Sequence, residues 1–122
     1  MAKKTILVVE DEKDMQAIYK DLLEDQYKVL QAFDTKEAMA KLKKHKVDLI
    51  ILDVIMPRET GDTFFVHMRQ MPEFKKIKVI VATVLGDLGP QFRRIDPVVV
   101  CLGKPFEKGV LLDIIKKSIE GK

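Results

Sequence analysis

Residues that could bind a metal ion or a phosphoryl group follow four apolar runs of this chain. Glu10 and Asp11 follow the first run, Asp53 the third and Thr83 the fourth, and Lys104 comes shortly after the fifth. A carboxylate beside an apolar core is costly unless it is paired, hydrogen-bonded or bound to a metal. The acidic residues at these positions therefore either have a partner or take part in chemistry.

The residue types indicate which chemistry this is. Glu10, Asp11 and Asp53 would repel one another in one crevice, and Mg2+ resolves such repulsion with only a few protein oxygens and its own waters. Lys104 adds a compact positive charge, and the hydroxyl of Thr83 adds a hydrogen-bond donor. Together these groups neutralise and position a phosphoryl group in transfer. The pattern predicts a Mg2+ site in which Asp53 is a nucleophile that forms an aspartyl phosphate.

Each of these residues also has an ordinary structural interpretation. Glu10 or Asp11, taken alone, is more simply explained as the N-cap of the first helix. Asp53 could form a turn at a strand end, Thr83 is a good strand residue, and Lys104 could be a solvated side chain. Their combination at matching strand ends is what favours a phosphoryl site.

The elements that must position these residues are short strands that alternate with helices. Apolar runs rich in Val and Ile predict strands at residues 6–9, 27–30, 49–52, 77–82 and 98–102. Three runs are continuous rather than alternating, which is typical of strands covered on both faces. Because the carboxyl ends of parallel strands share one edge of a sheet, the candidate residues are expected to converge there.

Amphipathic helices are predicted between the strands and after the last one. Asp34 and Glu37 predict a capping box at the start of the second helix. Residues 84–96, which include two glycines and Pro90, predict only a short, weak fourth helix. The pattern indicates an open α/β fold with right-handed crossovers. The apolar positions that define the first, third and last helices are Met15, Ile18, Tyr19, Leu22, Leu23; Phe64, Phe65, Met68, Met71; and Val110, Leu111, Ile114, Ile115, Ile119.

Composition limits the class of protein. The 122 residues fit one domain with one core, and a net charge of +3 with interleaved acids and bases does not predict direct nucleic-acid binding. We interpret the basic run "KLKKHK", Lys41 to Lys46, as a solvated helix face. A single cysteine excludes an internal disulfide and suits a reducing cytoplasm. Neither a signal peptide nor a membrane span is evident, so no membrane partner is expected.

Taken together, the motifs resemble a receiver domain of a two-component response regulator, over residues 1–122 as a single domain. The resemblance rests on "ILVVEDEKDM", "DLIILDVIMPRETG", "VIVAT" and "GKP". It implies a flavodoxin-like, doubly wound α/β fold with helices on both faces of the sheet. The five parallel strands would have the order 2-1-3-4-5, in a three-layer α/β/α arrangement.

The resemblance also implies a role for each site residue. Asp53 would be the phosphoacceptor, and Asp53, Asp11 and the backbone carbonyl of Ile55 would bind Mg2+ directly. Glu10 would act on the metal through a water, and Thr83 and Lys104 would contact the phosphoryl oxygens.

The implied partners are proteins. A histidine kinase or a phosphotransfer protein would supply the phosphoryl group, and the output would be contact with a downstream protein or a phosphorylation-dependent dimer. The domain would not be an enzyme beyond its own phosphotransfer and autodephosphorylation. Three features depart from the family pattern. Cys101 replaces a switching aromatic residue, and Val84, in place of Ala or Gly, would restrict the access of water and of the phosphodonor. The third is the weak fourth helix, which lies in the family's usual output face, so an unusual relay to a partner is expected.

Three other functions share part of this pattern. A receiver-like interaction module that is not regulated by phosphorylation remains the alternative. A phosphatase of the haloacid dehalogenase type would need a general acid two residues after Asp53, where this chain has Ile55. A flavin-binding flavodoxin relative would need a phosphate-cradling loop after the first strand, where "VVEDEKDM" is acidic.

Overall fold

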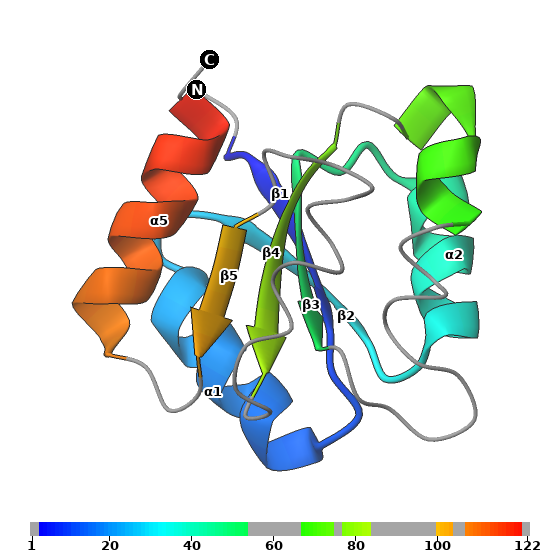
Figure 1. Ribbon diagram of the computed structural model, residues 1–122. Coiled ribbons are helices and arrows are strands. Elements are labelled where there is room, and N and C mark those ends of the chain that lie inside the picture. Colours follow the sequence, from blue (N-terminus) through cyan, green and yellow to red (C-terminus); the bar gives the residue numbers. More distant parts are fainter. Residues whose placement is uncertain (1–2, 54–66, 75–76, 84–99, 104–106, 121–122) are drawn as a thin grey trace.

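The computed structural model describes residues 3–53, 67–74, 77–83, 100–103 and 107–120. Strands and helices alternate along most of the described chain, as the apolar runs predict (Figure 1). In order, the elements are β1 (Thr5–Val9), α1 (Lys13–Leu23), β2 (Lys28–Ala32), α2 (Thr35–Lys44), β3 (Leu49–Asp53), the 3-10 helix η1 (Pro72–Phe74), β4 (Lys78–Thr83), β5 (Val100–Gly103) and α5 (Lys108–Glu120).

The strands form one parallel sheet in the order β2-β1-β3-β4-β5, which is the order that the resemblance implied. β2 lies at an edge of the sheet, and β1 pairs with both β2 and β3. All strands run in the same direction, so their carboxyl ends lie together at the lower edge of the molecule in Figure 1. The candidate residues were expected at this edge.

Helices cover both faces of the sheet, in three layers. Figure 1 shows α2 on one side of the strands and α1 with α5 on the other. Alternate strand residues belong to two separate cores: Leu7 and Ile50 pack on the α2 side, whereas Ile6 and Ile51 pack on the side of α1 and α5. Each fully buried aliphatic side chain stabilises the fold by about 1.5–3 kcal/mol. Burial on both faces explains why the strands are continuous apolar runs.

The inward faces of α1 and α5 differ slightly from those predicted. Ile18 and Val110 were assigned to apolar stripes, but each side chain is 46% exposed. On α1 the buried positions are Gln16, Tyr19 and Leu23, which follow the i, i+3, i+7 spacing of one helix face. The helix is therefore rotated so that a polar residue, Gln16, takes a position that an apolar residue would normally hold.

The helix α2 begins as predicted. Asp34 is its N-cap and accepts a hydrogen bond from the Glu37 N–H at 2.8 Å. The Glu37 carboxylate accepts from the N–H of Phe33, one residue before the cap, at 2.9 Å. This is a capping box whose return bond is displaced by one residue.

The other predicted helices are covered only in part. Residues 67–70 are helical and Met68 is fully buried, in agreement with the third predicted helix, whereas Phe64, Phe65 and the predicted fourth helix lie outside the described residues. Among the helices that the structure describes, none is long and apolar enough to cross a membrane.

Candidate functional site

The register of the sheet brings the predicted site positions together in the backbone. Val9 of β1 is paired with Leu52 of β3. The residues that follow them, Glu10 and Asp53, are therefore neighbours. Asp53 is in turn paired with Ala82 of β4, the residue before Thr83. The acidic residues and the hydroxyl residue therefore follow one another across three adjacent strands.

The same register extends to the fifth strand. Thr83, the last residue of β4, is paired with Gly103, the last residue of β5. Lys104, which follows Gly103 in the sequence, lies outside the described residues, as does Ile55. For Asp53 and Thr83 the structure describes the backbone, and their side chains are outside its scope.

Glu10 is a buried carboxylate held at the end of β1. Only 1% of the residue is exposed. Its backbone N–H donates to the Ala32 carbonyl at 3.0 Å, and its Oε2 accepts from the Glu12 N–H at 3.2 Å. Asp11 is partly exposed beside it. A buried carboxylate is costly without compensation. The Glu10 carboxylate therefore needs stabilising interactions that an exposed acid does not need.

The alternative interpretation of Glu10 or Asp11 as a helix N-cap is wrong. The first helix begins at Lys13, and its N-cap is Glu12, whose side chain makes no capping hydrogen bond. The acidic pair precedes the cap and belongs to the connection between β1 and α1. The Glu10 carboxylate accepts the backbone N–H of Glu12, the N-cap residue itself.

Sequence reasoning missed Gln16, which is also 1% exposed. Its side-chain amide nitrogen lies 3.1 Å from the Val8 carbonyl oxygen, 3.0 Å from that of Glu10 and 2.8 Å from that of Ala32. The sequence signal for this residue is its spacing with Tyr19 and Leu23 on the inward face of the helix. The end of β2 contributes the Ala32 carbonyl to this arrangement.

The described residues do not complete a metal site. No three His, Cys, Asp or Glu side chains converge within the part of the chain that the structure describes. Two of the three predicted carboxylates, Glu10 and Asp11, are in that part, and the register places Glu10 beside the Asp53 backbone. Their hard oxygen donors are of the kind that Mg2+ prefers.

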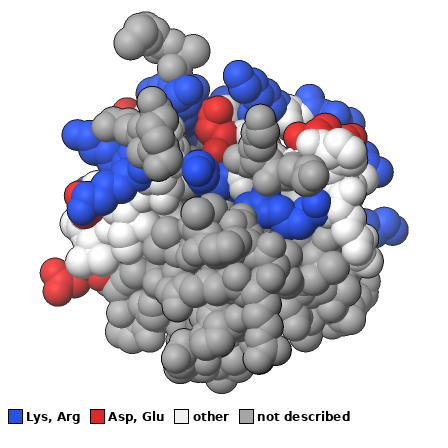
Figure 2. All heavy atoms as spheres, turned by 45° about the horizontal axis from the view of Figure 1, so that its top comes forward, with Lys and Arg blue, Asp and Glu red and all other residues white. Residues whose placement is uncertain are grey.

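Several lysines of the described chain lie at the opposite end of the sheet from the candidate site. Figure 2 looks toward the end of the molecule at which the strands begin, and Lys and Arg side chains surround the upper part of that face among a few acids. The exposed Lys3, Lys4 and Lys46 precede β1 and β3 and so belong to that end. Salt screens such charges over about 8–10 Å, so these lysines contribute little at the opposite edge.

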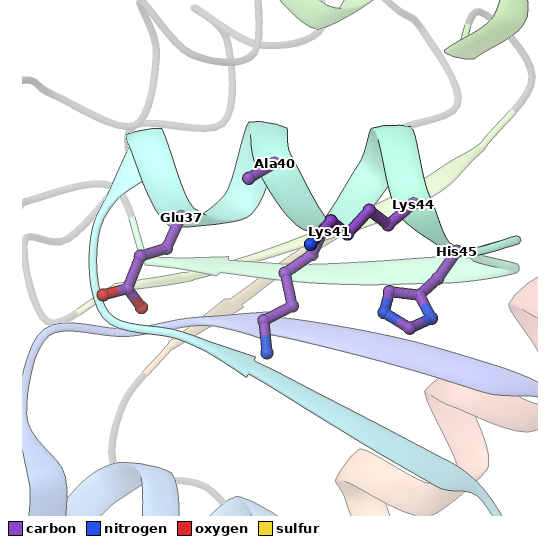
Figure 3. A pocket seen from close by; sticks show the side chains of 5 residues that line it. All are labelled: Glu37, Ala40, Lys41, Lys44 and His45. Carbon is purple, nitrogen blue, oxygen red and sulfur yellow. The ribbon is translucent and has the colours of Figure 1, made fainter.

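A surface pocket of about 360 Å3 lies against α2. The described residues around it are Glu37, Ala40, Lys41 and Lys44 of that helix, together with His45 at its end (Figure 3). Lys44 and His45 are exposed, in agreement with a solvated basic face. Among the described residues that line this pocket, none follows a strand end of the candidate site.

Comparison with known proteins identifies the family to which this arrangement belongs. The response regulator receiver domain family matches residues 6–116 of the chain. The chain belongs to the response regulator receiver domain family. This confirms the resemblance that the motifs indicated, and it assigns the receiver fold to nearly all of the described residues.

Relatives of this receiver domain occur within larger signalling proteins. It is 35% identical to hybrid signal transduction histidine kinase D of Dictyostelium discoideum over 85 residues, which are 70% of this chain and 6% of that protein. It is 33% identical to response regulator RR06 of Streptococcus pneumoniae over 116 residues, 93% of this chain and 52% of that protein. The chain thus spans a small part of that histidine kinase and about half of that response regulator.

A solved structure agrees with the fold. Chemotaxis protein CheY4 of Vibrio cholerae superposes on this receiver domain with a TM-score of 0.88 and 29% identity. The match covers 96% of this chain and 99% of that one. The described strands and helices therefore have the arrangement of a known receiver domain.

Proposed function

We propose that this receiver domain is a phosphoacceptor of a two-component system or phosphorelay, phosphorylated on Asp53 in the presence of Mg2+. The observation that carries the proposal is the strand register: Glu10, followed in the sequence by Asp11, adjoins Asp53 on one side, and Thr83 follows on the other. Family membership supports the same assignment.

The proposed reaction is a phosphoryl transfer from a phosphohistidine. An Asp53 carboxylate oxygen forms a bond to phosphorus while the bond from phosphorus to the donor's imidazole nitrogen breaks, and the imidazole leaves with the electron pair. Bound Mg2+ would supply charge neutralisation for the phosphoryl oxygens.

The residues of the chain divide the remaining tasks. Glu10, Asp11, Asp53 and the carbonyl of Ile55 would hold the metal, with Glu10 acting through a water. The Thr83 hydroxyl and Lys104 would bind phosphoryl oxygens and position them. The burial of Glu10 beside the strand ends supports this role, because a bound cation offsets the cost of a buried carboxylate.

The proposed partners are a histidine kinase or phosphotransfer protein upstream and a protein target downstream. Relatives that are histidine kinases and response regulators support an upstream kinase. Signalling would take place in the cytoplasm by protein contact, including a phosphorylation-dependent dimer, with residues 1–122 acting as one folded unit. It would not require direct contact with nucleic acid or a membrane.

Phosphorylation from a small donor tests the proposal. Acetyl phosphate with Mg2+ should add one phosphoryl group per chain, seen as a hydroxylamine-sensitive adduct in intact-mass spectra. Asp53→Asn should abolish the adduct, whereas Asp25→Asn, which removes an exposed acid after α1, should retain it. Undiminished labelling of Asp53→Asn would contradict the assignment.

The alternative, an interaction module without phosphorylation, makes a different prediction. Such a module would not bind beryllofluoride, which mimics an aspartyl phosphate, in a Mg2+-dependent manner. Binding that requires both Mg2+ and Asp53 would exclude this alternative.

A further inference from the structure

Gln16 connects three parts of the backbone that meet behind the candidate site. Its side-chain amide reaches the carbonyls of Val8 and Glu10, at the end of β1, and of Ala32, the last residue of β2. Its own backbone carbonyl accepts from the Gln31 side chain at 3.2 Å. One residue of α1 thus joins the ends of two strands to the start of the helix.

The orientation of this amide is determined by its surroundings. Only the NH2 end of the side chain can face three carbonyl oxygens, since an amide oxygen there would be repelled. Two N–H groups serve three acceptors at 2.8–3.1 Å, so one N–H is shared. The Gln16 Oε1 is buried and has no hydrogen-bond partner among the described residues. An unpaired buried acceptor is unfavourable, so the bonds made by the NH2 group are what offset the burial of this side chain.

These hydrogen bonds restrain the backbone that carries Glu10 and Asp11. Glu10 is held on both sides of its Cα: its N–H donates to Ala32, and its carbonyl accepts from Gln16. The Ala32 carbonyl accepts from both Glu10 and Gln16. With both peptide groups of Glu10 bonded, the direction of its side chain and the path of the chain into Asp11 are restrained.

We propose that Gln16 is a positioning residue that holds Glu10 and Asp11 in place for Mg2+ binding. The inference rests on the proposed function, because it assigns Gln16 a task at the same metal site. Gln16 does not touch the metal or the phosphoryl group, and it acts through the backbone of Glu10. A ligand pair that is held in place before binding loses less conformational freedom when the metal arrives, which raises the affinity.

Substitution of Gln16 by Met tests the proposal. Met has a similar length and shape but no N–H donors, so Gln16→Met removes the three contacts while filling the same space. Mg2+ affinity, measured by calorimetric titration of folded protein, should fall about tenfold, equivalent to about 1.4 kcal/mol. Amide hydrogen exchange at Glu10 should become faster in the same variant.

Two control variants separate positioning from general stability. Gln31→Met makes the same chemical change in a side chain that donates to the backbone carbonyl of Gln16 and not to Glu10, and it should leave Mg2+ affinity unchanged. Ile115→Val removes one buried methyl group from α5 and lowers stability without touching the Glu10 backbone. It too should bind Mg2+ as wild type does.

The outcomes distinguish the inference from the function on which it rests. If wild type binds Mg2+ and Gln16→Met binds it equally well, Gln16 has a structural role only and the inference is wrong, while the proposed function stands. If wild type itself does not bind Mg2+, the proposed metal site is wrong and the inference falls with it. Should Gln16→Met fail to fold, Gln16→Asn provides the test, since it keeps the amide on a shorter side chain. Affinity several-fold below wild type supports the proposal, and wild-type affinity refutes it.

Discussion

Val9 of β1 lies directly beside Leu52 of β3 in the parallel sheet. β1 ends at Val9, and β3 ends one residue after Leu52, at Asp53. This pairing therefore makes Glu10 and Asp53 neighbours, although they are 43 positions apart in the sequence. Parallel strands that end at the same level place their last residues at one edge. The register therefore brings Glu10 beside Asp53, and the connection from β1 to α1 then carries Asp11.

Mg2+ should stabilise the fold. Glu10, Asp11 and Asp53 adjoin at one edge, and a cation that binds only the native state raises its stability by about 2.7 kcal/mol at a hundred times its dissociation constant. Thermal melts with and without millimolar Mg2+ should show a higher melting temperature for wild type and a smaller rise for Asp11→Asn. Asp25→Asn, which removes an exposed charge elsewhere, is the control. An equal rise in Asp11→Asn would exclude Asp11 as a ligand.

Thr83→Ala should slow phosphorylation of Asp53 without preventing it. Thr83 ends β4 beside Gly103, and its proposed hydroxyl bond to a phosphoryl oxygen is worth about 1 kcal/mol net, which corresponds to a several-fold change in rate. The rate of labelling by acetyl phosphate measures this effect. Thr83→Ser should restore the rate, because it keeps the hydroxyl. Equal rates in wild type and Thr83→Ala would show that the hydroxyl has no such role.

Asp34→Ala should destabilise the domain by about 1 kcal/mol. Asp34 accepts the Glu37 N–H at 2.8 Å at the start of α2, and alanine leaves that donor without its cap. Urea unfolding curves give the free energy of unfolding, with Asp34→Ser as the variant that keeps an oxygen acceptor. Lys36→Ala, at an exposed position of the same turn, should change stability very little. A loss in Lys36→Ala as large as that in Asp34→Ala would argue against the cap.

Asp48→Ala should destabilise the opposite edge of the sheet. Asp48 accepts the Thr5 N–H on its side chain at 2.8 Å and donates its own N–H to the Thr5 carbonyl at 2.9 Å. Loss of a charged acceptor from a partly buried donor costs about 1.5–3 kcal/mol. Asp48→Asn keeps an oxygen and should recover part of the loss. Because this pair lies where β1 and β3 begin, the Mg2+-induced rise in melting temperature should persist in Asp48→Ala.

Local patterns in the sequence determined the type of fold and the identity of the candidate residues. The continuous apolar runs predicted strands buried on both faces, and polar residues directly after those runs marked one edge of a parallel sheet. The capping box at Asp34 was also predictable, since its partners lie three and four residues apart. These features depend on neighbours in the chain, so their signal is contained in short windows of sequence.

Only the tertiary structure decided which face of each helix points inward and what holds the acidic pair. Ile18 and Gln16 differ by two positions on one helix, and apolar spacing alone assigned the burial to the wrong one. The shortest side-chain hydrogen bond of Gln16 joins this helix residue to Ala32 of β2, 16 residues away in the sequence. A polar residue is buried favourably only where the fold supplies its hydrogen-bond partners. Those partners here are carbonyls at the ends of β1 and β2, which meet only once the sheet has formed.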